Sequence, residues 1–149
     1  LKQYQDMDAL NKSLYKIIQE MSKGVIDLRN AQKQIETVRE LSMSDDVTVK
    51  ANALDQSLTS WVNKILQPNF QTFQHLYQME AKHLMEVKGL IGRMASSDVP
   101  VSKGAREVAQ RYIDEWNVLA AELSALKNND IASFNTEMKS AGLPEIFLK

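Results

Sequence analysis

Cysteine is absent from the 149 residues, and glycine and proline are scarce, with five and three residues. Without cysteine the chain has no disulfide, no thiolate metal site and no cysteine nucleophile. So few turn-forming residues argue against an all-β fold, which needs turns at short intervals. No apolar run approaches the ~18 residues that span a bilayer. These absences predict an all-α protein, one domain over residues 1–149, that does not insert into a membrane.

The chain also lacks an excess of charge of either sign. The chain carries 18 basic and 19 acidic residues, so its formal net charge is −1. Nucleic acids and anionic lipid surfaces are bound mainly through a basic excess or a basic patch. We therefore expect no nucleic-acid partner, and recognition through shape and apolar contacts.

Apolar residues recur every three or four positions along most of the chain, which is the spacing of one helical face. The pattern predicts long helices over residues 4–41, 47–65, 78–95 and 102–126, and a short one over 131–140. Pro68 ends the second helix, Ser102 caps the fourth, and Asn128-Asn129-Asp130 breaks the chain before the fifth. The predicted fold is an up-and-down four-helix bundle with a short fifth C-terminal helix.

Catalytic and metal-binding patterns are weak. Glu80 and His83 have the Glu-x-x-His spacing of bundle di-iron sites, but His75 has Thr72 where the second glutamate belongs. The alternative is a surface helix with a partly exposed His83, and this alternative is favoured because half of the ligand set is missing. No nucleophile elbow or phosphate loop occurs. We expect no metal, no cofactor and no enzyme activity in this chain.

Aromatic residues give two further candidate groups. Trp61 and Trp116 fall on the apolar stripes, where large core anchors are favoured over a ligand cage. Phe70, Phe73 and Tyr77 lie in the least regular stretch, between the second and third helices. These three either fold over the end of the bundle or contact a partner.

The C-terminal third resembles a bacterial family. The resemblance is carried mainly by Trp116, Leu119 and Leu126 and by residues 130–146, which contain Gly142-Leu143-Pro144. It extends to Leu66-Gln67-Pro68 with residues 71–74, and to Ile26 with residues 28–30. The family comprises large exported proteins with BNR (Asp-box), sortilin-like β-propellers, often labelled glycosyl hydrolases. Its Asp-box, Ser-x-Asp-x-Gly-x-Thr-Trp, is absent from this chain, so no catalytic residue carries over.

The resemblance implies a non-catalytic accessory domain, for scaffolding or docking, at the C-terminus of such a propeller protein. Its partner is then the propeller of the same polypeptide or another protein, in an extracytoplasmic location. The chain also opens on Leu1 within a helical pattern, without an initiator methionine, and we expect a fragment of something longer. The alternative is a stand-alone extracytoplasmic sensor or ligand-binding bundle, with a pocket between helices that Trp61 and Trp116 line.

Three positions of the resemblance have structural roles. Asn135 is expected to tie the last helix by bonding exposed carbonyls at a helix end, whereas Gly142 and Pro144 stop that helix.

Overall fold

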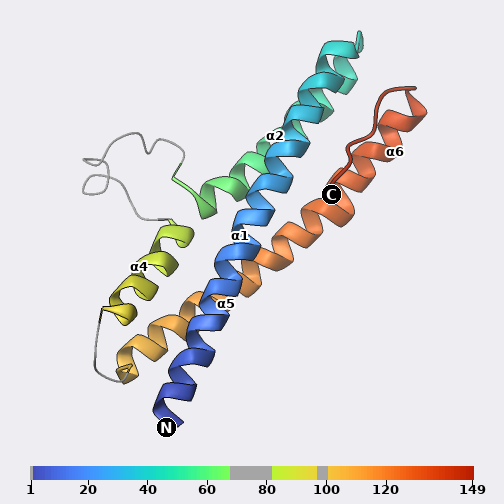
Figure 1. Cartoon of the computed structure of the whole chain (residues 1–149). Coiled ribbons are helices and arrows are strands. Elements are labelled where there is room, and N and C mark those ends of the chain that lie inside the picture. The colour runs from blue at the N-terminus through green and yellow to red at the C-terminus, as the bar shows by residue number, and fades with distance from the viewer. Residues whose placement is uncertain (1, 68–81, 97–100) are drawn as a thin grey trace. The chain divides into compact units, whose positions relative to one another are not determined.

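The computed structural model describes residues 2–67, 82–96 and 101–149, and these are almost entirely helical (Figure 1). The helices are α1 (Lys2–Leu41), α2 (Asp45–Ile65), α4 (His83–Ala95), α5 (Lys103–Ala125), the π-helix η1 (Leu126–Ile131) and α6 (Ala132–Ser140). No strand occurs in these ranges. The prediction of an all-α helical bundle is confirmed. Within the same ranges, no helix combines the length and apolar character that crossing a membrane requires.

The chain divides into two compact units, which are described separately. Unit 1 comprises residues 1–22 and 63–119, and unit 2 comprises residues 23–62 and 120–149. Helices α1, α2 and α5 contribute to both units because the division falls within them. The single-domain organisation stays a prediction.

Unit 1 buries the apolar faces of three helices. Its core includes Leu14, Ile17 and Met21 of α1, Leu84, Val87, Leu90, Ile91 and Met94 of α4, and Ala109, Tyr112 and Trp116 of α5. Helix α4 begins at His83, later than the predicted residue 78, because Lys82 before it has an extended backbone. Residues 78–81 lie outside the described ranges. Ser102 caps α5 as predicted, since its hydroxyl accepts a hydrogen bond from the Ala105 backbone N–H at 3.2 Å.

Unit 2 is built on the C-terminal part of α1, most of α2, and the continuous run of α5, η1 and α6. The predicted stripe of α2 is buried, and so is the apolar stripe of α1. The core consists of Val25, Leu28, Ala31, Ile35 and Val38, then Val47, Ala51, Leu54, Leu58, Trp61 and Val62, and finally Ile131, Phe134, Met138 and Ile146.

The predicted break at Asn128-Asn129-Asp130 is wrong, because the chain continues there as the π-helix η1. Apolar residues step by three and four along α5 up to Leu126, and the next one, Ile131, is five positions further on. A π-turn inserts one residue into a helix without ending it. The insertion brings Ile131 and Phe134 back to the buried side, while Asn129 and Asp130 stay exposed.

The end of α6 follows a Schellman motif. Gly142 has a φ of +70°, in the left-handed region that favours glycine. The Leu143 N–H donates to the Met138 carbonyl at 2.9 Å, and the Gly142 N–H donates to the Lys139 carbonyl at 3.2 Å. The predicted short last helix therefore ends at Ser140 and turns at Gly142.

Gly24 allows a close approach inside unit 2. A Cβ atom at this position would lie 2.8 Å from Cδ2 of Leu123 and 2.9 Å from the ring of Trp61. The sequence left open whether Gly89 or Gly92 has such a role, and a Cβ at Gly92 would meet nothing within 4 Å.

Replacing Gly24 with alanine is expected to destabilise the protein, although alanine is the better helix former. The rigid Trp61 ring has to move, and overpacking of this kind costs about 1–3 kcal/mol against ~1 kcal/mol gained in helix propensity. Gly92→Ala is the matched control, and should raise stability by up to ~1 kcal/mol. Urea unfolding of both variants measures the difference, and a Gly24→Ala protein as stable as Gly92→Ala would contradict the prediction.

Candidate functional site

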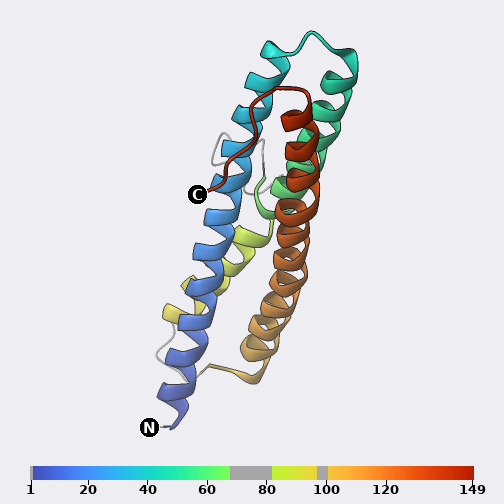
Figure 2. The ribbon, with the colours of Figure 1, turned by 90° about the vertical axis from the view of Figure 1, so that its right-hand side faces the viewer.

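An extended segment follows α6 in unit 2. After Gly142 the chain has no helical structure, and residues 143–149 form what we call the tail. In Figure 2 the tail, drawn in dark red, turns at the end of α6 and runs back beside that helix to α1. An extended segment has no internal hydrogen bonds, so its backbone groups must find other partners.

Two side-chain amides provide those partners. The Asn135 amide on α6 donates to the Ile146 carbonyl at 2.8 Å, and its oxygen accepts from the Ile146 N–H at 2.6 Å. The Gln34 amide on α1 does the same for Phe147, with both bonds at 2.8 Å. Asn135 thus ties the last helix to the tail, rather than bonding the carbonyls of a helix end.

The two tail residues differ sharply in exposure. Ile146 is 4% exposed and belongs to the core of unit 2, whereas Phe147 is 74% exposed. A cavity of about 360 Å³ lies beside the end of the tail, lined by Asp27, Asn30, Lys33 and Gln34 of α1 and by Phe147, Leu148 and Lys149. We call the surface of α1 and α6 that holds residues 146–149 the tail groove.

A buried carboxylate stands at one end of the tail groove. Asp27 is 6% exposed, and one of its oxygens accepts hydrogen bonds from Lys127 at 2.6 Å and Lys23 at 2.8 Å. Burial raises the pKa of Asp27, but the hydrogen bonds and charges of Lys127 and Lys23 outweigh it and hold the pKa below its usual value. The Lys23 ammonium also donates to the Lys149 carbonyl at 3.3 Å, so the same group reaches the tail.

A second, more open cavity of about 470 Å³ lies between α2 and the η1–α6 segment. Its polar lining includes Lys50, Asn129, Asp130 and Glu137. Hydrogen bonds to Glu137 and Asp46 raise the pKa of Lys50 to about 12. Lys50 is therefore held by acidic neighbours of its own chain, and it joins α2 to α6.

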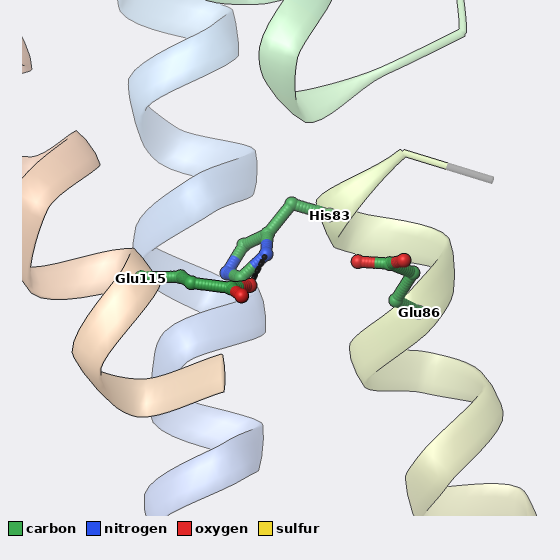
Figure 3. Close-up of side chains that lie close together, drawn as sticks. All are labelled: His83, Glu86 and Glu115. Carbon is green, nitrogen blue, oxygen red and sulfur yellow. Dashed lines mark ion pairs between the residues drawn. The ribbon is translucent and has the colours of Figure 1, made fainter. Parts of the chain in front are cut away.

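Unit 1 contains a cluster of possible metal ligands. Each of His83, Glu86 and Glu115 offers one ligand atom, and these atoms lie within 4.8 Å of one another (Figure 3). Three such ligands, with water in a fourth position, resemble a catalytic zinc site in number. His83 is 6% exposed, so the prediction of a partly exposed histidine is wrong.

The contacts of His83 favour a structural role for this cluster. Its Nδ1 lies 3.3 Å from Glu115, and its ring meets Tyr112 edge-on with centroids 5.9 Å apart. Its Nε2 is buried without a hydrogen-bond partner among the described residues, whereas a metal-bound histidine normally donates from its second nitrogen. Glu115 is exposed and also lies 3.7 Å from Arg111. The cluster is thus weaker than the tail groove as a candidate site.

The other predicted site residues fall in different places. Trp61 is 2% exposed in unit 2, and Trp116, at 3%, donates to the Glu20 carboxylate at 2.8 Å in unit 1. Phe70, Phe73 and Tyr77 lie outside the described residues.

Sequence reasoning missed Gln34 and Asp27. Asp27 carried a usable signal, because it lies four residues before Ala31 and eight before Ile35, on the buried face of α1, where a charged group needs a partner. Gln34 carried none, since its partner Phe147 is 113 residues away.

Replacing Asn135 with leucine should lower the free energy of unfolding by about 1–3 kcal/mol, because the Ile146 N–H and carbonyl lose their partners. Thermal unfolding measures the loss. Gln110→Leu removes an exposed amide bonded only within its own helix, to Asp114, and serves as the control. An Asn135→Leu protein with an unchanged melting temperature would contradict the prediction.

The lowered pKa of Asp27 makes part of the stability depend on pH. A carboxyl with a depressed pKa in the folded state stabilises the protein above its ordinary pKa of about 4, and this stabilisation is lost as the pH falls through the folded-state pKa. Asp27→Asn should therefore cost roughly 2 kcal/mol at pH 7, and this cost should shrink as the pH is lowered below about 4. Urea unfolding over a series of pH values from 7 downwards, with the exposed Asp8→Asn as control, tests this. A cost that does not change with pH would count against it.

Comparisons of the chain with protein-family models, with curated proteins and with solved structures find no match.

Proposed function

We propose that this chain is a non-catalytic helical accessory module, a scaffold or docking domain, appended to an exported BNR/sortilin-like propeller protein. The observation that carries the proposal is the tail fastened across α1 and α6 by Asn135 and Gln34. It is a way of holding a polypeptide segment on a helical surface, and it uses no group suited to bond-making chemistry.

Some of the residues that carry the family resemblance take part in this fastening. Gly142 turns the chain out of α6, Pro144 lies in the extended segment, and Asn135 binds Ile146. Residues that turn the chain and bind its backbone support a structural or docking function. The link to a propeller rests on the sequence resemblance.

The polar groups of the tail groove support the same function. Asp27 accepts hydrogen bonds from two lysines, and the amides of Asn135 and Gln34 form hydrogen bonds with the tail. Groups satisfied in this way fix a shape, whereas a general acid or base needs access to a substrate proton.

The coding sequence upstream of Leu1 tests the link to a propeller. The proposal expects a β-rich region with Ser-x-Asp-x-Gly-x-Thr-Trp boxes there. A start codon directly before Leu1 would overturn the propeller part of the proposal.

Cross-linking of the whole natural polypeptide tests docking. With an amine-reactive cross-linker and peptide mapping by mass spectrometry, we expect cross-links between lysines of this chain and the upstream region. Joint replacement of Phe70, Phe73 and Tyr77 with alanine should reduce their yield several-fold if these aromatics make the contact. Tyr15→Ala, at an aromatic residue 55% exposed on α1, is the control. The absence of any cross-link to the upstream region would contradict docking within one polypeptide.

A further inference from the structure

The tail groove recognises backbone more than side chains. In an extended segment, the N–H and carbonyl of one residue point to the same side, and those of the next residue point to the opposite side. Asn135 on α6 takes both groups of Ile146, and Gln34 on α1 takes both groups of Phe147. The two amides therefore hold an extended peptide from both sides, and because they bond only its backbone, these hydrogen bonds do not depend on its side chains.

One side chain of the tail supplies the sequence preference. Ile146 is buried at 4% exposure, whereas Phe147 is mostly exposed. The peptide that fits is an extended segment with a branched aliphatic residue at the first clamped position. The Lys23 ammonium adds a contact to the carbonyl of Lys149, three residues further on.

The tail is connected in a way that allows it to leave without unwinding α6. The Schellman bonds end at Leu143, and a Cβ at Gly142 would meet nothing within 4 Å. Residues 143–145 separate this turn from the first clamped residue, and Pro144 among them is exposed. The turn at Gly142–Leu143, where the tail can swing away, is therefore separate from Ile146 and Phe147, where the two amides bind it.

We propose that the tail groove is a binding site for an extended peptide in trans, and that its partner is the tail of a second copy of this chain. The proposal rests on the proposed function as a docking module and names its partner. The segment that fits the groove is this chain's own tail, and every second copy carries it. When two copies exchange their tails, each tail makes in its partner's groove the hydrogen bonds that it makes in its own, as in domain swapping. We call the form in which each tail lies in its own groove the closed form. The covalently attached tail competes at an effective concentration of the order of millimolar, so wild-type exchange needs similarly concentrated protein.

Two complementary variants test the proposal in the full chain. Ile146→Asp disables the tail and leaves the groove, whereas Asn135→Leu weakens the groove and leaves the tail. Mixed together, they should form a one-to-one complex, measured by size-exclusion chromatography with light scattering. The mixed pair should associate at least 10-fold more tightly than either variant with itself. A chain with both substitutions is the control, and should form no such complex with a second sample of itself.

Two outcomes would overturn the proposal: no complex near 1 mM while both variants keep their helical circular dichroism, or a complex formed equally well by the double variant.

If Ile146→Asp unfolds, a synthetic peptide with the sequence of residues 143–149 is added in excess. It should raise the melting temperature or restore helicity, because a ligand of the folded state stabilises it. The same peptide carrying aspartate for isoleucine should not, and no effect of either peptide would overturn the proposal. Failure here leaves the cross-linking test untouched, because that test probes the upstream region in the whole polypeptide.

Discussion

The backbone of the tail sets a constraint that joins the helices of unit 2. A segment that leaves a helix and lies on the protein surface brings N–H and carbonyl groups that need partners. Because successive residues of an extended segment point in opposite directions, one partner must come from each side. Asn135 and Gln34 meet this requirement only if α6 and the C-terminal part of α1 flank the tail. The two amides therefore connect α6 to α1 through the tail.

The π-helix η1 makes this arrangement compatible with a buried core. The apolar step of five from Leu126 to Ile131 would rotate α6 away from the core if the helix stayed α-helical throughout. The extra residue restores Phe134 to the buried face and places its neighbour Asn135 beside the tail. Lys127, within the same π-turn, reaches Asp27. The one inserted residue therefore places Asn135 of α6 beside the tail and Lys127 of η1 beside Asp27 of α1.

The helices were predictable from the sequence because apolar periodicity is a local signal. The stripe of α2 from Val47 to Ile65 is buried throughout, and the Ser102 cap and the Gly142 turn lie where local chemistry put them. The π-turn was not predicted because Asn128-Asn129-Asp130 is typical of a helix break, and only the five-residue step from Leu126 to Ile131 distinguishes a π-turn from one. The pairs of the site were not predictable, since Asp27 and Lys127 are 100 residues apart and periodicity carries no information about such partners.

The energetics of the tail explain why a clamp of this kind suits an interaction module. Four hydrogen bonds at about 1 kcal/mol each, together with ~2–3 kcal/mol from burying Ile146, favour the closed form. Ordering the tail, residues 143–149, opposes it at about 1–2 kcal/mol for each residue, a cost that offsets this gain. The tail of a second copy makes the same contacts at the same ordering cost, so an exchange of tails loses no contact energy. The buried isoleucine, rather than the amides, decides which segment is bound.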